Sequence, residues 1–129
     1  MNKVVHFEIP FENEERAKKF YQSAFGWQIS KVPEMDYNMV TTVETDQQTM
    51  MPKTPGAING GLMKKDPATG EHTVVVIDVA DIDGHLKLIE QAGGKIVMPK
   101  IAVGDFGLYA RVSDTEGNVV GIWQNRPKQ

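Results

Sequence analysis

The sequence predicts an α+β domain in which the order strand, helix and three strands occurs twice. Two patterns predict this class. Apolar residues alternate with a period of two along several short segments, and two longer segments carry apolar residues at helical spacing. The 129 residues match the common size of one domain and can bury a core. Hydrophobic residues are 40% and charged residues 24%, so the composition is that of a globular protein.

The first half begins with a predicted strand, Val4–Ile9, bounded by Pro10. Alternation places His6 and Glu8 on one face of this strand, with Val4. A helix is expected from an N-cap at Asn13 to Gly26. The apolar stripe expected to pack this helix on the sheet is Ala17, Phe20, Tyr21, Ala24 and Phe25. Three more strands are predicted at Trp27–Val32, Tyr37–Val43 and Ile58–Met63.

The second half repeats this order. His72 opens the apolar run Thr73–Val79, and Asp81 is expected to cap a helix that ends at Gly93-Gly94. The apolar face of that helix is expected to be Ile82, Leu86 and Ile89. Three strands follow, at Lys95–Met98, Leu108–Ser113 and Val119–Gln124. We therefore predict one domain, 1–129, made of two βαβββ modules at 1–65 and 70–129.

The spacing between matching residues indicates an internal duplication. His6 and His72 are 66 residues apart, and the helix-ending glycines Gly26 and Gly94 are 68 apart. The interval then shortens to 60 between Gly61 and Gly121. The first half therefore contains extra residues within Glu44–Pro55, a polar segment for which a surface loop is expected rather than a mobile lid.

Composition excludes several classes of function. Without cysteine, the chain can form no disulfide and no thiolate metal site. A net charge of -3 gives no electrostatic basis for binding nucleic acid or an acidic membrane surface. The first residues lack a long apolar run, and no segment approaches the length of a membrane span. The expected location is therefore the cytoplasm.

Motifs in both halves carry a family resemblance. In the first half they are His6-Phe-Glu-Ile-Pro, Phe20-Tyr21, Phe25-Gly26-Trp27 and Asn59-Gly60-Gly61-Leu62. In the second half they are His72, Ala92-Gly93-Gly94, Asp114–Asn118 and Gly121-Ile122-Trp123-Gln124. Together they resemble the vicinal oxygen chelate superfamily of glyoxalase I, extradiol dioxygenases and bleomycin-resistance proteins. The last motif of each half further resembles a short bacterial glyoxalase-like subgroup.

The resemblance implies a paired half-barrel with a pocket between the modules, a small-molecule ligand and a homodimer. It also implies that His6 and His72 occupy two ligand positions of a divalent metal site. The two last-strand ligand positions fall at Gly60 or Gly61 and at Gly121, and glycine has no side chain to coordinate a metal. We therefore expect an incomplete metal site and assign no cofactor beyond a candidate divalent metal. A conventional glyoxalase I site is not expected.

Glu8 is the candidate catalytic residue, because it shares a face with His6. It could serve as a substitute metal ligand, as a general base, or as a buried acid paired with an arginine such as Arg111. Trp123 shares an orientation with Gly121, where a metal-binding carboxylate would otherwise lie. Core packing is the alternative role for the aromatic residues. The expected pocket residues are His6, Glu8, Tyr37, Asn59, His72, Tyr109 and Trp123.

Three functions remain open from the sequence. The first is a glyoxalase-like enzyme that moves protons with Glu8 and the histidines. The second is a binding protein that sequesters a small hydrophobic or planar compound. The third is a metal-dependent lyase or dioxygenase whose ligands have moved to other positions.

Overall fold

The computed structural model describes residues 1–126, which form two compact units with the same order of elements. The N-terminal unit holds His6–Asp66 and Glu71–Thr73. The C-terminal unit holds Met1–Val5, Pro67–Gly70 and the chain from Val74 onward. Each unit is a βαβββ module, so the predicted α+β class and its repeated module are confirmed.

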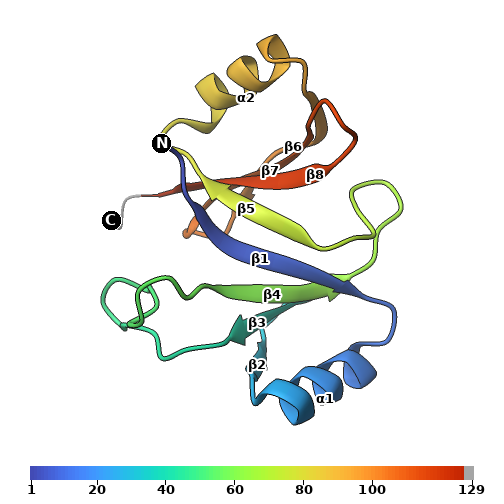
Figure 1. The fold of residues 1–129 in the computed structure, drawn as a ribbon, viewed down its shortest axis with the longest axis vertical. Coiled ribbons are helices and arrows are strands. Elements are labelled where there is room, and N and C mark those ends of the chain that lie inside the picture. The colour runs from blue at the N-terminus through green and yellow to red at the C-terminus, as the bar shows by residue number, and fades with distance from the viewer. Residues whose placement is uncertain (127–129) are drawn as a thin grey trace. The chain divides into compact units, whose positions relative to one another are not determined.

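The N-terminal unit contains four strands and one helix within its described residues. They are β1 (Val4–Phe11, from His6 onward in this unit), α1 (Glu14–Phe25), β2 (Gln28–Lys31), β3 (Tyr37–Thr41) and β4 (Asn59–Lys64). The strand order is β2-β3-β4-β1, and only the β1–β4 pair is parallel (Figure 1). β1 continues through Pro10, where the sequence predicted an end, because the fixed φ of proline is compatible with an extended backbone.

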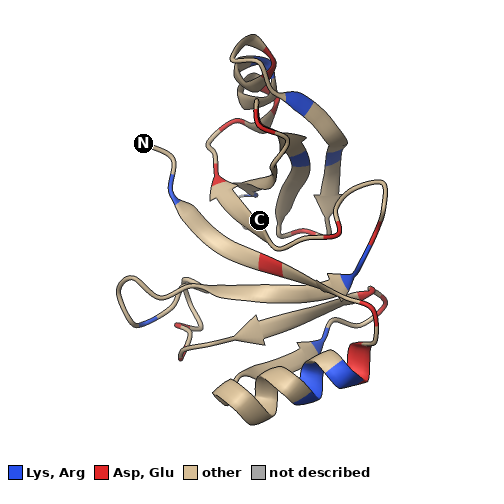
Figure 2. Ribbon diagram, turned by 45° about the vertical axis from the view of Figure 1, so that its right-hand side comes forward, with Lys and Arg blue, Asp and Glu red and all other residues tan. Residues whose placement is uncertain are grey.

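Helix α1 has the expected caps. The Oδ1 atom of Asn13 accepts a hydrogen bond from the N–H of Arg16 at 3.0 Å, and Gly26 ends the helix with a φ of 70°. Acidic residues lie in the first turn and basic residues follow them (Figure 2).

Of the five residues predicted for the apolar stripe of α1, Ala17 and Tyr21 pack against the core, whereas Ala24 and the two phenylalanines are exposed. Tyr21 packs on the sheet and stacks against Trp27, with ring centroids 4.9 Å apart. Phe20 and Phe25 were also expected to face the sheet, but they are 56% and 62% exposed. Phe25 packs against the ring of Trp27, with ring centroids 5.7 Å apart.

The core of the N-terminal unit lies between α1 and one face of its sheet. Its buried residues are Phe11, Val40 and Leu62, with Phe7, Ile9, Ala17, Tyr21, Trp27 and Ile29 packed around them. Since side chains alternate along a strand, His6 and Glu8 project from the opposite face. The core therefore fixes which face of the sheet carries the polar residues.

The C-terminal unit has the same plan. Its elements are β5 (Val74–Asp78), α2 (Ile82–Gln91), β6 (Lys95–Val103), β7 (Gly107–Ser113) and β8 (Val119–Asn125). The strand order is β5-β8-β7-β6, with β5 and β8 parallel. β6 extends past the predicted end at Met98, and two shifts of register let it bend and stay paired with β7. The N–H of Asp78 donates to the Lys3 carbonyl at 2.9 Å, which joins the start of the chain to this unit.

Helix α2 is capped differently from the prediction. The side chain of Asp81 makes no capping hydrogen bond, and the N–H of Ile82 donates instead to Oε1 of Gln124 on β8 at 2.8 Å. The helix ends at Gln91, before the predicted glycine pair. Its apolar face meets a core of Val79, Ile82, Leu86, Ala110, Val112 and Ile122, with Ile89 packed against it.

The chain between β3 and β4 is a long surface connection with internal order. Thr45 and Pro52 form an isolated β-bridge, and Lys53 pairs with Glu44 at 2.8 Å. The carboxylate of Asp46 accepts hydrogen bonds from the N–H groups of Gln48 and Thr49. The matching connection of the C-terminal unit, between β7 and β8, is the short turn 114–118.

Candidate functional site

The candidate site lies on the sheet face of the N-terminal unit that points away from α1. In the β1–β4 register His6 is paired with Asn59, and Glu8 is paired with Gly61. On the other side of β4, Gly61 is paired with Met39 of β3. Paired residues project to the same face, so His6, Glu8 and the exposed backbone of Gly61 lie together.

Tyr37 reaches this group from β3. Its hydroxyl lies 2.7 Å from Nε2 of His6, and the two groups form a hydrogen bond. The ring crosses β4 directly over Gly61, where a Cβ atom would overlap the tyrosine hydroxyl. Gly61 is therefore required by the contact between Tyr37 and His6, as in other sheets where an aromatic ring covers a glycine on the next strand.

Burial and charge act in opposite directions on His6. Burial lowers the pKa of its imidazole below the ordinary value, and the negative charge of Glu8 raises it in part. Glu8 itself is only 5% exposed. The imidazole is therefore neutral at pH 7, next to a carboxylate that stabilises its protonated form.

Asn59, expected in the pocket, has a structural role in this unit. Its Oδ1 atom accepts hydrogen bonds from the N–H groups of Thr42 and Val43 at 2.8 and 3.3 Å. Its Nδ2 atom donates to the hydroxyl of Thr45 at 2.9 Å. Asn59 thus fixes the start of the β3–β4 connection, at the β4 position paired with His6.

The C-terminal unit repeats the arrangement of tyrosine over glycine. A Cβ atom at Gly121 would lie 2.6 Å from the hydroxyl of Tyr109. Here the tyrosine accepts a hydrogen bond from Nε of Arg111 at 2.9 Å, and Nη1 of Arg111 donates to the carbonyl of Thr69 at 3.2 Å. Arg111 is 7% exposed. The tyrosine of each unit thus bonds a basic side chain, but His6 reaches it from β1, whereas Arg111 lies two residues along the tyrosine's own strand.

Trp123 does not cover Gly121 but a different glycine of the C-terminal sheet. Its ring covers Gly107, and its Nε1–H donates to Oδ1 of Asn125 at 2.7 Å. The aromatic residue that covers Gly121 is Tyr109, and sequence alternation along one strand could not identify it. The contact runs diagonally between β7 and β8, a relationship that requires the register of the two strands.

The two histidines do not occupy equivalent positions. Glu8 is paired with Gly61 in one unit and Val76 is paired with Gly121 in the other, so the counterpart of His6 is the buried Val74. His72 lies two residues before β5 and is exposed. The expectation that both first strands carry a histidine is therefore wrong, because an equal spacing along the chain does not ensure equal register.

The donor set does not fit a four-ligand divalent metal site. Among residues 1–126, no group of three or more His, Asp or Glu side chains is placed to hold a metal ion. Both last-strand positions, Gly61 and Gly121, are covered by tyrosine rings. The residues on these two sheet faces therefore do not fit the divalent metal that the family resemblance implies.

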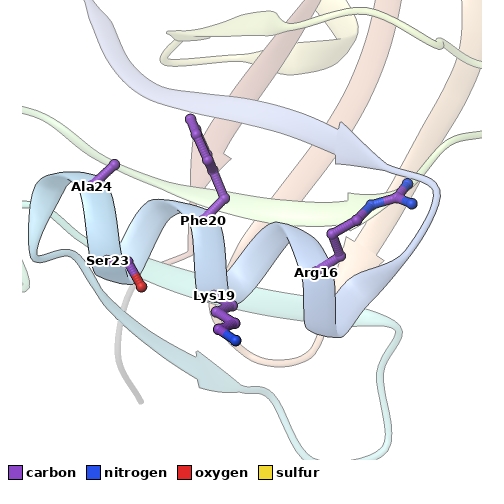
Figure 3. Close-up of a pocket in the computed structure, with 5 residues that line it drawn as sticks. All are labelled: Arg16, Lys19, Phe20, Ser23 and Ala24. Carbon is purple, nitrogen blue, oxygen red and sulfur yellow. The ribbon is translucent and has the colours of Figure 1, made fainter.

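A separate shallow hollow lies along the outer side of α1. Its lining side chains project from one helix, as Figure 3 shows, and are Arg16, Lys19, Phe20, Ser23 and Ala24. None of the candidate site residues lines this hollow.

Within residues 1–126, no helix has the length and apolar character needed to cross a membrane.

Sequence comparisons agree with this fold. The profile of the bleomycin resistance protein-like N-terminal family matches residues 3–43. Proteins of Mycobacterium bovis and Mycobacterium tuberculosis, each described as a candidate glyoxylase and named CFP32, are 32% identical over 112 residues. That match covers 84% of this chain, which spans 40% of the length of those relatives.

Solved structures with the same fold have low sequence identity. A glyoxalase/bleomycin resistance protein/dioxygenase superfamily member from Vibrio splendidus has a TM-score of 0.63 at 13% identity, over 97% of this chain and 99% of its own. Methylmalonyl-CoA epimerase of Streptomyces coelicolor, in complex with 2-nitronate-propionyl-CoA, has a TM-score of 0.63 at 12% identity, over 98% and 99%. The resemblance to the vicinal oxygen chelate superfamily is therefore confirmed, with both βαβββ modules of its fold present in this chain.

Proposed function

We propose that the protein processes a small molecule by moving a proton through the His6–Tyr37 pair. The observation that carries this proposal is the 2.7 Å hydrogen bond between the Tyr37 hydroxyl and Nε2 of His6, on the sheet face opposite the core. A superfamily fold found in enzymes such as an epimerase agrees with a small-molecule ligand. The reaction class we assign is exchange of a proton on a carbon next to a carbonyl group.

The pair can act as a relay. The Tyr37 oxygen takes a proton from the ligand's carbon while its own proton passes to Nε2 of His6, and the reverse transfer returns a proton to the carbon. A neutral imidazole can accept that proton, and burial holds His6 neutral at pH 7. No covalent bond to the protein is required.

Glu8 is proposed to stabilise the imidazolium that forms. Its charge favours protonated His6, and it lies on the same face of β1 two residues away. A carboxylate that favours the charged state of a general base lowers the energy of the proton-transfer step. Glu8 therefore acts through His6, as a positioning and electrostatic residue.

Deuterium exchange tests this proposal. The protein is incubated in D2O with a panel of acyl thioesters, 2-oxo aldehydes and ketones, and deuterium incorporation is followed by mass spectrometry. We expect exchange with at least one member of the panel, and a loss of about a hundred-fold or more in His6→Ala and in Tyr37→Phe. The control is His85→Ala, a histidine on α2. If exchange persists in both site variants, or if no member exchanges, proton transfer by this pair is excluded.

The second candidate function is sequestration of a small hydrophobic or planar compound. The match of residues 3–43 to the bleomycin resistance protein-like profile favours it. If this alternative holds, calorimetric titration should detect binding of bleomycin, and the compound should be recovered unchanged. Turnover of a panel compound with no bleomycin binding would exclude it.

Two further expectations remain proposals. A homodimer is expected from the family resemblance, and light scattering at several protein concentrations tests it. A cytoplasmic location stays a prediction from the sequence, and fractionation of cells that express the natural protein tests it.

A further inference from the structure

We propose that the β3–β4 connection forms a second ligand subsite that binds an uncharged, hydroxyl-rich group. A recess of about 460 Å³ lies in the N-terminal unit between this connection and the start of β2. That volume falls in the range of about 300–1,000 Å³ for small-molecule sites. Its lining residues are Gly26, Gln28, Thr41, Thr42, Val43, Glu44, Thr45, Gln47 and Lys53. None of these residues belongs to the His6–Tyr37 pair.

Hydrogen bonds and an ion pair preorganise the wall of the recess. Asn59 holds Thr42, Val43 and Thr45 by hydrogen bonds from both ends of its amide. The Glu44–Lys53 ion pair and the bridge between Thr45 and Pro52 then close the connection. Ordering a loop costs backbone entropy, so these bonds leave less of that cost to be met on binding.

The chemistry of the wall favours a neutral ligand with hydroxyl groups. The side chains of Gln28, Thr41 and Gln47 make no hydrogen bond to any other residue in the range 1–126. Each can both donate and accept, which matches the two roles of a hydroxyl group. The charged side chains, Glu44 and Lys53, are paired with one another at 2.8 Å, so the recess carries no net charge.

The strand register places the recess in line with His6. His6 is paired with Asn59, and Thr41 is paired with Gln28. Since Val40 is paired with Gly60, Thr41 lies next to Asn59 across the β3–β4 boundary. One row across the same face of the sheet therefore runs from His6 to Gln28 over three strand spacings, about 14 Å. A ligand of that length would place its hydroxyl-rich end in the recess and its reactive carbon at His6, and this alignment rests on the proposed function.

The duplication supports a dedicated role for this segment. The C-terminal unit joins the equivalent strands by the turn 114–118, and its residue equivalent to His6 is Val74. The longer connection and the histidine therefore occur together, in one unit of two. Variation in the length of a surface loop does not by itself explain why this connection lies in the same strand row as His6.

Binding of methyl β-D-glucopyranoside tests the subsite. The sugar is titrated into ¹⁵N-labelled protein, with cyclohexanol and sodium glucuronate as apolar and charged comparators. We expect shifts of the amide signals of residues 26–28, 41–47 and 53 with the glucoside, and weaker shifts with both comparators. Gln47→Leu and Thr41→Val should each weaken binding by about three- to ten-fold, the effect of one lost hydrogen bond. Gln48→Leu is the matched control, because the adjacent Gln48 does not line the recess.

The proposal is overturned if the glucoside shifts none of these signals at 50 mM, about the upper limit for a weak site. Equal shifts with cyclohexanol, or equal weakening by Gln47→Leu and Gln48→Leu, would overturn it too. The sugar titration and the deuterium-exchange assay, both run on the natural protein, separate the two proposals. Retained sugar binding without deuterium exchange would leave the subsite and remove the proton-transfer function. Exchange without sugar binding would do the reverse.

Discussion

The hydroxyl of Tyr37 and the imidazole of His6 meet at 2.7 Å over a residue that has no side chain, Gly61. The two strands that carry them, β3 and β1, are separated by β4. The glycine of that middle strand opens the path, so the contact depends on three residues from three strands. A substitution at any of the three should therefore alter the contact between Tyr37 and His6.

Gly61→Ala should therefore destabilise the protein. The new Cβ would overlap the Tyr37 hydroxyl, and relief of such overpacking costs about 1–3 kcal/mol in the free energy of unfolding. Urea denaturation measures this cost. In a Tyr37→Ala background the same change should cost less, because the overlapping ring is gone. An equal cost in both backgrounds would show that the tyrosine is not the group the Cβ meets.

The stability of the protein should depend on the protonation of His6. Its folded pKa lies below the value of about 6.5 for an unfolded histidine, so the unfolded chain binds more protons in the interval between the two values. The contribution from the neutral imidazole is complete above about pH 6.5. It is lost as the pH falls through that interval toward the folded pKa. Unfolding at pH 7.5 and pH 5.5 should show a smaller loss in His6→Asn than in the natural protein.

An NMR titration of the imidazole gives an independent measure. We expect the apparent pKa of His6 to lie below the value of about 6.5 for an unfolded histidine, and Glu8→Gln to lower it further because the favourable charge is removed. A rise of the His6 pKa in Glu8→Gln would contradict the assigned electrostatic role of Glu8.

Asn59→Ala should loosen the β3–β4 connection. The amide fixes Thr42, Val43 and Thr45, and loss of a hydrogen-bond partner leaves donors unsatisfied at about 1–3 kcal/mol. Hydrogen exchange of the amides at 42–53 should become faster. The control is Thr54→Val in the same segment, whose hydroxyl makes no hydrogen bond to the described residues. Unchanged exchange in Asn59→Ala would mean that other contacts hold this segment.

Two leucines of α2 provide a matched test of the C-terminal core. Leu86 is 8% exposed and packs against β7 and β8, whereas Leu88 is 57% exposed. Leu86→Ala should lower the free energy of unfolding by about 2–4 kcal/mol, through lost burial and the cavity that remains. Leu88→Ala should change it by less than about 0.5 kcal/mol. Urea denaturation measures both losses. Similar losses at the two positions would contradict the finding that Leu86, and not Leu88, faces the core.

Local periodicity was sufficient to predict the order of elements, the α1 caps and the α+β class. It failed where the outcome depends on contacts between elements. Phe20 belongs to the predicted stripe of α1 but is exposed, and its ring packs edge-on against Tyr21 rather than on the sheet. Asp81 has the residue type of an N-cap, yet Gln124 from β8 supplies the acceptor.

The candidate site shows the same division. Alternation along β1 correctly placed His6 and Glu8 on one face, away from the core. The spacing of His6 and His72 suggested equivalence, but register assigns Val74 to that place. Tyr37 was expected only to line a pocket, and its hydrogen bond to His6 could not be derived without knowing that it crosses Gly61.

The repeated tyrosine-over-glycine arrangement lets the two copies of an ancestral module diverge in one electrical property. In the N-terminal copy the tyrosine contacts a histidine, whose imidazole is neutral at pH 7 and gains a charge as the pH falls. In the C-terminal copy it contacts an arginine, whose charge is permanent. The basic partner comes from the first strand in one copy and from the tyrosine's own strand in the other, so this contact can change its charge with pH in the N-terminal copy and keeps its charge in the C-terminal copy.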